Sequence, residues 1–563
     1  MTGKKLLVVG GVAGGASCAA RARRLSENAD IIVFEMGPYV SFANCGLPYY
    51  VGNVITEEDD LLVATPEKFR DWFNIDVRIN SEVTAIHRED REVSVRDLQT
   101  GRTYRESYDT LVLSPGSVAV KPPIPGIGMP GIFTVKDIPD TRVILDWMSR
   151  HRTRHCTVVG AGFIGLEMTE NLKRRGLDVT VVEMQRQVMP AVDPEMADFV
   201  GEHMKAHGVE LRLQAQVTEF TAGDKHRIAV RLNTGEIIDT DMVILAIGVR
   251  PQVQLAEAAG LAIGTTGGIV VDESMRTSDP FIWAVGDAVQ ARDRILGQEC
   301  LVPLAGPANR QGRNAADAIM GGVASHRRFT GIQATSICGV FGMSLAATGL
   351  AEKKLKQLLE SGCGLSYDKV FLHPDHHAAY YPDAKTITLK LLFETDSGRL
   401  LGAQALGMEG VDKRIDVIAM AIQKEGTVFD LEDAELCYAP QYGSAKDPVN
   451  LAGMVAANIV RKEVDNAHWQ DLGNADPLIL DVREPDEFDK GHVPGAVNIP
   501  LGQIRSRMSE LPENVEIWAH CFVGKRSYYA TRILSQNGFR VKNLSGGYLM
   551  HLAVNKPEGS GYN

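Results

Sequence analysis

The sequence predicts an α/β fold with two units of parallel sheet, followed by an α+β region and a smaller C-terminal α/β region. A short apolar run, a glycine-rich turn and a helical segment occur twice, within residues 5–35 and 157–183. Strands mix with a helical stretch between about 331 and 455, and a polar stretch precedes a last strand-and-helix segment. The 563 residues suffice for about three to five domains, at about 100–200 residues per domain.

The first unit begins with the apolar strand Lys5–Val9 and runs through a helix to a second strand, Ile31–Glu35. Continuous apolar strands of this kind are typical of a parallel sheet. Position 12 is valine where a strict G-x-G-x-x-G motif has glycine, so the turn is either a nucleotide-binding loop or a turn that needs positive φ. If the turn is a nucleotide-binding loop, its amides face a pyrophosphate and Glu35 binds ribose hydroxyls. The predicted cofactor-binding residues are Gly10, Gly11, Ala13, Gly14, Gly15 and Glu35.

The second unit repeats this pattern with a loop that matches the dinucleotide motif in full. The loop is Gly160-Ala161-Gly162-Phe163-Ile164-Gly165, and the second strand ends at Glu183. A carboxylate at that position accepts ribose hydroxyls and repels a 2′-phosphate, so NADH is favoured over NADPH. Arg186 lies nearby in sequence and makes a partial preference possible. The predicted cofactor-binding residues are Gly160, Gly162, Gly165 and Glu183.

A third element is a buried strand, Ile282–Val285, that ends in a glycine turn carrying Asp287. With the two loops and the segment Ile247–Pro251, it resembles the two-dinucleotide flavoprotein disulfide reductases over about residues 1–455. The resemblance implies bound FAD and NADH, with Asp287 at the flavin ribityl chain. It also implies two Rossmann-like domains, the nicotinamide domain inserted into the flavin domain. The expected domains are FAD-binding at 1–150 and 271–330, NAD(P)H-binding at 151–270, and an α+β dimerisation domain at 331–460.

Cys45 lies in the segment Ser41–Tyr49 and is the predicted redox nucleophile. Many reductases of this superfamily carry a Cys-x-x-x-x-Cys pair, but the fifth residue after Cys45 is Tyr50. A single thiol must cycle through a mixed disulfide, a persulfide or a sulfenic acid. The segment resembles coenzyme A disulfide reductases, with single-cysteine NADH oxidases and peroxidases as their nearest relatives. The alternative is a buried structural cysteine.

The same resemblance implies further residues around the thiol. In that family, tyrosines matching Tyr380 and Tyr438 reach the cysteine from the partner subunit, which implies a homodimer; the alternative is two packing tyrosines. A phenol there donates a proton to the leaving thiolate. The basic run 21–24 faces coenzyme A phosphates or is a solvated helical face, and Phe73 stands where the family has a lysine. The implied coenzyme A contacts are Ser17, Arg21, Arg24, Ser41 and Asn44.

The C-terminal segment carries a second lone thiol, Cys521, at the start of a loop that ends in Arg526-Ser527 and runs into a helix. With Asp481–Phe488 and Gly546–Tyr548, it resembles the rhodanese domain. Loop amides, a helix N-terminus and Arg526 favour a thiolate and hold a persulfide anion. An inactive rhodanese-like binding module is the alternative. We expect a linker at 461–471 and the rhodanese-like α/β domain at 472–555.

Composition limits the class of protein and its partners. The net charge of −12 argues against nucleic acid, and no apolar run reaches the length of about 18 residues expected of a membrane span. The cysteines are sparse and scattered, which predicts no metal site and a cytoplasmic protein. The other six cysteines are interpreted as structural or incidental: Cys18, Cys156, Cys300, Cys338, Cys363 and Cys437.

Taken as a whole, the chain resembles the coenzyme A disulfide reductase/rhodanese fusions, also described as NADH-dependent persulfide reductases. The resemblance implies an NADH-dependent FAD enzyme that reduces persulfides, polysulfides, or coenzyme A persulfide or disulfide. Cys521 accepts sulfane sulfur, coenzyme A carries it, and Cys45 reduces it, releasing hydrosulfide and thiol. The partners are small-molecule sulfur donors and coenzyme A species. Three alternatives stay open: a coenzyme A disulfide reductase with an auxiliary rhodanese domain, an NADH oxidase, and a sulfurtransferase with a regulatory flavin half.

Overall fold

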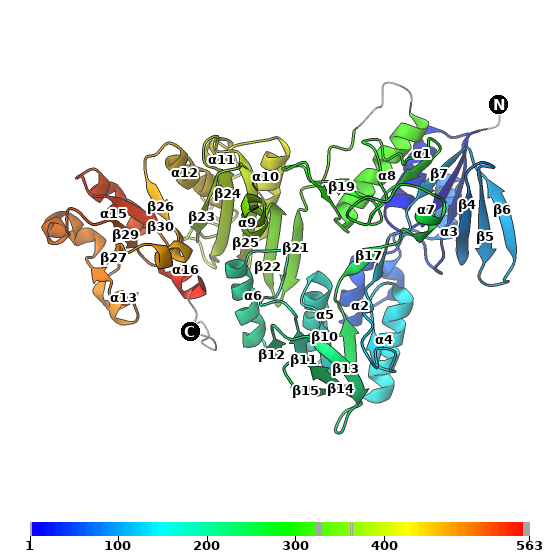
Figure 1. The fold of residues 1–563 in the computed structure, drawn as a ribbon, viewed down its shortest axis with the longest axis horizontal. Helices are drawn as coiled ribbons and strands as arrows, with labels where there is room; N and C mark the ends of the chain where they lie inside the picture. The colour runs from blue at the N-terminus through cyan, green and yellow to red at the C-terminus, as the bar shows by residue number, and fades with distance from the viewer. Residues whose placement is uncertain (1–2, 322–327, 361, 363, 555–563) are drawn as a thin grey trace. The chain divides into compact units, whose positions relative to one another are not determined.

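The computed structural model describes residues 3–321, 328–360, 362 and 364–554 (Figure 1). Cys363, interpreted above as incidental, lies outside them. The chain forms two compact units. Unit 1 is Met1–Arg186 with Gly208–Ala334, and unit 2 is Gln187–His207 with Thr335–Asn563.

The first sheet of unit 1 is parallel, with the strand order β18-β7-β1-β2-β3. Strand β18 pairs with β7 although the whole second dinucleotide loop and its strands lie between them in sequence, which confirms the predicted insertion of one dinucleotide domain into the other. Helices α1 and α8 pack together over the sheet, with Cys18 and Ala315 in the shared core (Figure 1). The elements are β1 Lys5–Val9, α1 Gly14–Leu25, β2 Asp30–Phe34, β3 Asp76–Arg78, β7 Thr110–Leu113, β18 Ile282–Ala284 and α8 Ala305–Met320.

The second sheet of unit 1 has the order β12-β11-β10-β16-β9. Its edge strand β9 lies in the segment expected to belong to the first domain. It joins this sheet because it pairs in parallel with β16, and the amide of Val243 donates to Gly131 O over 2.8 Å. The elements are β9 Ile132–Phe133, α4 Ile138–His151, β10 His155–Val159, α5 Phe163–Arg174, β11 Asp178–Val182, β12 Val209–Arg212 and β16 Met242–Leu245.

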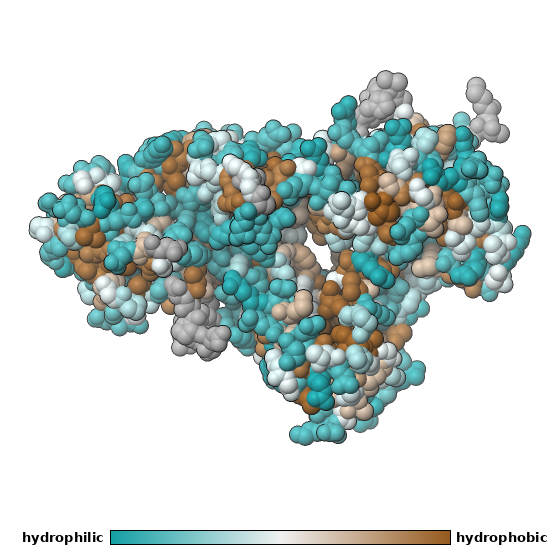
Figure 2. All heavy atoms as spheres, viewed as in Figure 1, coloured by the Kyte–Doolittle hydropathy of each residue, from teal (hydrophilic) through white to brown (hydrophobic). Residues whose placement is uncertain are grey.

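Smaller elements complete unit 1. Two antiparallel three-stranded sheets are β4 Ser81–His87, β5 Glu92–Asp97 and β6 Thr103–Ser107, and β13 Val217–Ala222, β14 Ile228–Leu232 and β15 Ile237–Thr240. Two strand pairs are β8 Ser117–Ala119 with β17 Val249–Pro251, and β19 Ala291–Arg292 with β20 Glu299–Cys300. The short helices are α2 Leu47–Val51, α3 Pro66–Phe73 and α7 Gln254–Ala258. On the face drawn in Figure 2, hydrophobic residues gather over α8 and in the region of α2 and α5.

Unit 2 contains the expected α+β domain, an antiparallel sheet of order β21-β22-β25-β24-β23. Helix α6 belongs to this unit, although its sequence lies within the segment expected for the nicotinamide domain. The strands are β21 Ser336–Val340, β22 Met343–Gly349, β23 Tyr367–Leu372, β24 Ile387–Glu394 and β25 Leu400–Gly407. The helices are α6 Pro194–Ala206, α9 Glu352–Glu360, α10 Val411–Gln423, α11 Val428–Glu432 and α12 Pro448–Val460.

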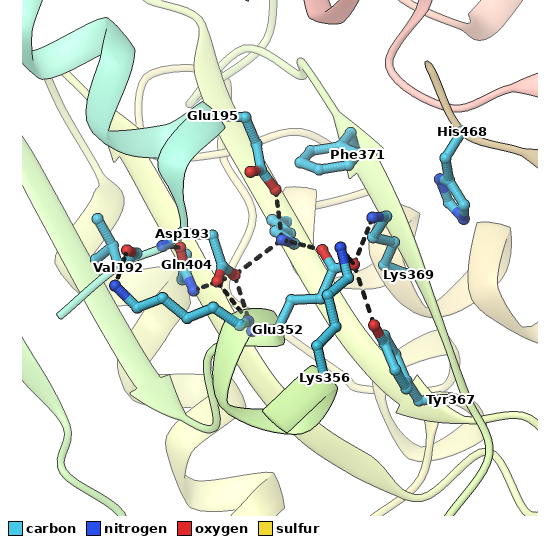
Figure 3. A network of polar contacts seen from close by, with 12 residues as sticks. Val192, Asp193, Glu195, Glu352, Lys356, Tyr367, Lys369, Phe371, Gln404 and His468 are labelled. Carbon is cyan, nitrogen blue, oxygen red and sulfur yellow. Dashed lines mark hydrogen bonds and ion pairs between the residues drawn. The ribbon is translucent and has the colours of Figure 1, made fainter. Parts of the chain in front are cut away.

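A buried charge network explains why α6 belongs to unit 2 (Figure 3). The ammonium of Lys390, which is fully buried, lies 2.8 Å from Asp193, 2.5 Å from Glu195 and 2.6 Å from Glu352. These carboxylates are close enough together to hold a metal ion, but they surround the lysine. Because buried charges are costly unless paired, the network ties the α6 segment to α9 and β24.

The C-terminal sheet of unit 2 is parallel, of order β26-β30-β29-β27-β28. Its strand β26 lies in the segment expected to be a linker, and its polar side chains contact β23. Asn466 donates to Lys369 O over 3.0 Å, and His468 hydrogen-bonds Asp368 over 2.8 Å. The elements are β26 Asp465–Ala467, β27 Leu478–Asp481, α13 Pro485–Asp489, β28 Val497–Asn498, α14 Ile504–Arg507, β29 Ile517–His520, α15 Lys525–Ser535, β30 Val541–Leu544 and α16 Gly547–Val554.

Candidate functional site

The first glycine loop packs too closely for side chains at its two ends. Gly10 has a φ of +90°, and a Cβ there would lie 2.1 Å from Ser114 O. A Cβ on Gly15 would lie 1.9 Å from Gly10 O. Only glycine lets strand β1, the turn and helix α1 approach this closely.

Glu35 and the start of α1 provide the polar groups of this loop. The Glu35 carboxylate accepts the amides of Gly11 and Gly37 over 2.8 and 2.9 Å, and burial raises its pKa. Ala13, at the helix N-terminus, gives no side-chain cap to α1. The first amides of α1 are therefore suited to a phosphate group, so these residues fit the pyrophosphate and ribose of FAD.

The second glycine loop repeats this geometry. The amide of Ala161 donates to Glu183 over 2.8 Å, as the amide of Gly11 does to Glu35. Gly160 has a φ of +101°, and Gly162, at the start of α5, has open space where a side chain would lie. The two loops thus share one arrangement although only the second has glycine at the third position. The second loop fits the pyrophosphate and ribose of NADH.

Asp287 follows β18 at the carboxyl edge of the first sheet. Its carboxylate accepts a hydrogen bond from Ser117 over 2.9 Å. The preceding Gly286 has a φ of +86° and donates its amide to Gln311, a buried side chain of α8, over 2.8 Å. Sequence reasoning did not identify Ser117 or Gln311, because neither belongs to a motif and only the fold brings them to this turn.

Cys45 lies in a short 3-10 helix, Asn44–Gly46, directly before α2, and is exposed. Partial burial of the thiol raises its pKa, and the charges of Glu167 and Asp287 raise it further. Burial raises the pKa of Glu167 to about 7. Sequence reasoning did not single out Glu167, although it lies two residues after the last glycine of the second loop. Unit 1 therefore places Cys45 beside residues of both dinucleotide domains.

The predicted coenzyme A contacts lie on α1 and in the loop that carries Cys45. The α1 residues differ in whether their polar groups already have a partner within the protein. Ser17 hydrogen-bonds Asn309, Arg21 pairs with Asp317 over 2.7 Å, and Arg24 is exposed. In the loop, Ser41 is buried with a φ of +49°, and Asn44 donates to the carbonyl of residue 136 over 3.4 Å.

The basic run also contains Arg23, which has a structural role. Arg23 is buried, and its guanidinium donates to Phe73 O and Asn74 O over 2.7 Å each. Of the three arginines in the run, Arg23 is therefore committed to backbone carbonyls.

Tyr380 and Tyr438 form a pair in unit 2, with their hydroxyls 2.9 Å apart. Both are well exposed, at 75% and 51%. Behind them the buried Arg414 pairs with Asp447 over 2.8 Å and donates to His376 O over 2.6 Å, joining the two segments that carry the tyrosines. The fold thus holds two phenols together on an exposed surface of unit 2.

Cys521 lies between β29 and α15 and is 1% exposed. Gly524 precedes α15 with a φ of +89°. The hydroxyl of Ser527 lies 3.7 Å from the Cys521 sulfur. Arg526 lies five residues after Cys521, within electrostatic reach of the sulfur, and forms a bidentate ion pair with Glu487, at 2.6 and 2.7 Å. The loop thus surrounds one sulfur with a hydroxyl, a guanidinium and a helix N-terminus, which suits a sulfur anion.

Family models match three parts of the chain. Residues 4–316 match the pyridine nucleotide-disulphide oxidoreductase model, 335–447 match the dimerisation domain of these enzymes, and 465–550 match the rhodanese-like domain. The last match includes β26, in the segment expected to be a linker. Among the described residues, no helix is long and apolar enough to cross a membrane.

Individual proteins resemble the chain over most of its length. The coenzyme A disulfide reductase of Staphylococcus haemolyticus is 35% identical over 456 residues, covering 81% of this chain and all of the relative. The reduced CoADR-RHD of Bacillus anthracis is 48% identical, with a TM-score of 0.94 and 98% of each chain covered. An NAD-dependent persulfide reductase from A. fulgidus is 38% identical, with a TM-score of 0.89 and coverage of 97% and 99%. The chain therefore belongs to the pyridine nucleotide-disulphide oxidoreductases, as an FAD- and NAD(H)-dependent oxidoreductase of the coenzyme A disulfide reductase family that carries a rhodanese-like domain.

Proposed function

We propose that this enzyme uses NADH to reduce persulfide sulfur that enters at Cys521 and is released as hydrosulfide at Cys45. The observation that carries the proposal is the Cys521 loop, where a buried sulfur lies 3.7 Å from the hydroxyl of Ser527 and within electrostatic reach of Arg526. A reductase that uses only Cys45 does not need a second loop suited to a sulfur anion. Its presence beside a single-thiol reductase supports sulfur capture followed by reduction.

The sulfur would move in two transfers. The Cys521 thiolate attacks the outer sulfur of a persulfide, the S–S bond breaks, and the donor leaves as a thiol. Coenzyme A thiolate then takes this sulfur and becomes coenzyme A persulfide, while Cys521 returns to the thiolate.

Reduction would take place at Cys45. Attack on the carbon-bound sulfur of the coenzyme A persulfide expels hydrosulfide and leaves a Cys45–coenzyme A disulfide. Attack on the outer sulfur expels coenzyme A and leaves a Cys45 persulfide. FAD, when bound, would supply the two electrons from NADH that restore the Cys45 thiol, with release of coenzyme A from the mixed disulfide or of hydrosulfide from the persulfide.

We assign the remaining predicted residues within this scheme. Tyr380 and Tyr438 of one subunit would donate protons to the thiolate leaving Cys45 of the other subunit, in a homodimer. Their exposure and their hydroxyl pair support this assignment. Arg24, the exposed arginine of α1, is the best candidate for a coenzyme A phosphate contact, because Arg21 is already paired. A cytoplasmic setting agrees with the free cysteines of the described chain.

Reduction of coenzyme A disulfide alone is the second candidate, with the rhodanese-like domain auxiliary. It is favoured by the relatives that match about four-fifths of this chain and all or nearly all of their own length, and that carry the name coenzyme A disulfide reductase. In that case Cys45 would suffice for the physiological reaction.

NADH-dependent hydrosulfide release by Cys45→Ser and Cys521→Ser variants tests the proposal. We expect Cys45→Ser to abolish release, and Cys521→Ser to impair it with bulky persulfides while leaving coenzyme A disulfide reduction intact. Cys437→Ser, at an exposed cysteine outside both loops, is the matched control. Full hydrosulfide release by Cys521→Ser from every donor would favour the second candidate. If sulfur transfer is the only activity found, and it needs neither NADH nor Cys45, the protein is better described as a sulfurtransferase.

A further inference from the structure

An ion pair between Glu487 and Arg526 lies at the end of the loop that begins with Cys521. Glu487 lies on α13 and Arg526 on α15, and the two nitrogens of the guanidinium bind the two carboxylate oxygens. Both side chains are about one-third exposed. A bidentate pair of this kind fixes the plane of the guanidinium as well as its position.

Glu487 is itself held in place by the start of α13. One of its carboxylate oxygens accepts the amide of Glu484 over 3.1 Å, closing a capping box. Arg526 lowers the pKa of Glu487 to about 2, so the carboxylate is charged throughout the working pH range. The negative charge is therefore a permanent part of the Cys521 site.

Of the other charged groups around the loop, Arg483 and His520 add no unbalanced positive charge, and Lys525 stays the same in every Glu487 variant. Arg483 forms its own bidentate pair with the buried Asp481, at 2.7 to 3.1 Å. His520, directly before Cys521, is fully buried, and burial lowers its pKa to about 4, so it is neutral. Lys525 is exposed at the start of α15. Arg483 and Arg526 thus help to fix the shape of the site, while a carboxylate balances the positive charge of each.

We propose that Glu487 is a specificity-determining residue that restricts Cys521 to sulfur donors with a single negative charge, such as alkyl persulfides. The inference rests on the proposed role of Cys521 as sulfur acceptor. A dianionic donor such as thiosulfate brings two charges to a thiolate, and a guanidinium balanced by Glu487 offsets little of that repulsion. A monoanionic donor meets about half of the repulsion, because interaction energy scales with the product of the charges.

Both donor classes follow the same balanced transfer. The Cys521 thiolate attacks the terminal sulfur of thiosulfate, the S–S bond breaks, and sulfite leaves with the bonding electron pair. With benzenethiosulfonate, benzenesulfinate leaves in the same way. In each case Cys521 holds the persulfide anion, and cyanide then takes the sulfur as thiocyanate and regenerates the thiolate.

The test compares kcat/KM for thiosulfate with kcat/KM for benzenethiosulfonate, using cyanide as acceptor and the full-length enzyme. We expect Glu487→Gln to raise the thiosulfate to benzenethiosulfonate ratio about fivefold or more, because it leaves Arg526 with an unbalanced charge. Glu487→Asp, which keeps the charge, should return the ratio close to that of the unchanged enzyme. Asp486→Asn is the matched control, because it removes a carboxylate from the same short helix, where Asp486 lies 3.7 Å from Lys490 and far out in solvent.

The possible outcomes separate this inference from the function on which it rests. An unchanged ratio in Glu487→Gln, or an equal loss for both donors, would show that Glu487 only supports the loop and would overturn the inference. Neither result touches the proposed role of Cys521, which is measured by loss of thiocyanate formation in Cys521→Ser. Transfer that survives Cys521→Ser would overturn both.

Discussion

The two thiols for which we propose chemistry, Cys45 and Cys521, differ in the groups that surround the sulfur. Cys521 is buried in a loop that supplies a guanidinium, a hydroxyl and a helix N-terminus. Cys45 is an exposed residue. Partial burial of its thiol and the carboxylates Glu167 and Asp287 raise the pKa of that thiol, which disfavours the thiolate. A hydroxyl and a helix N-terminus lie at one sulfur, whereas burial and two carboxylates raise the pKa of the other.

This difference fits the two roles proposed for them. A sulfur acceptor must be a thiolate before the donor arrives and must then hold a persulfide anion. For the redox role proposed for Cys45, Glu167 is the candidate proton partner, because its pKa of about 7 lets it take or give a proton near neutral pH. The comparison predicts that substitutions in one loop leave the chemistry of the other unchanged.

The largest effect is expected from Arg526→Gln. Removing the guanidinium takes a polar partner from the Cys521 site and leaves the Glu487 charge unpaired. Sulfur transfer from benzenethiosulfonate to cyanide should therefore fall about a hundredfold, a typical loss for a group that stabilises a developing anion. NADH-dependent reduction of coenzyme A disulfide should not change. Arg505→Gln, at an exposed arginine of α14, is the control. A parallel loss of both activities would mean that the two sites are not independent.

A smaller effect is expected at the nicotinamide site, which serves only the Cys45 chemistry. Glu183→Arg should raise the ratio of kcat/KM for NADPH to kcat/KM for NADH about tenfold, because a cation replaces the carboxylate that repels a 2′-phosphate. Glu183 also accepts the amides of Ala161 and Gln185, so Glu183→Gln serves as a control for the loss of loop contacts. If both variants change kcat/KM for NADPH and for NADH by the same factor, Glu183 does not select between the two coenzymes.

The smallest effect concerns the protonation of Cys45. Glu167→Gln should lower the pKa of the Cys45 thiol and speed its alkylation by iodoacetamide about threefold above pH 7. Below pH 7 the two rates should converge, because Glu167 is then protonated and as neutral as glutamine. Glu57→Gln, at an exposed carboxylate of the same unit, should leave the profile unchanged. A rate difference that persists at pH 5 would contradict this explanation.

The sequence predicts the dinucleotide loops well because their function demands local geometry. Gly10 and Gly160 are glycines in left-handed turns, and each loop is followed by a carboxylate one strand later, so both sites can be read from spacing. The polar segment at 461–471 was harder to interpret. Asn466 and His468 are polar because they bind β23, and a polar strand that bonds to another domain has the composition of a linker.

The residues that tune each site could not be predicted, because they come from distant parts of the chain. Glu487 stands in the quoted rhodanese motif, but only the packing of α13 against the loop shows that it binds Arg526. Glu167 likewise acquires its raised pKa from burial beside α2, which no local pattern reveals.

By itself, the sequence determined the fold class, the two dinucleotide loops and the pair of lone thiols, since each depends on residues close together in the chain. Only the tertiary structure decided which arginines have a partner that fixes the side chain or balances its charge. Arg21, Arg23, Arg483 and Arg526 look alike in sequence, yet each has a buried or fixed partner in the fold. The reason is physical: the effect of a charge depends on its partners and its burial, and folding sets both.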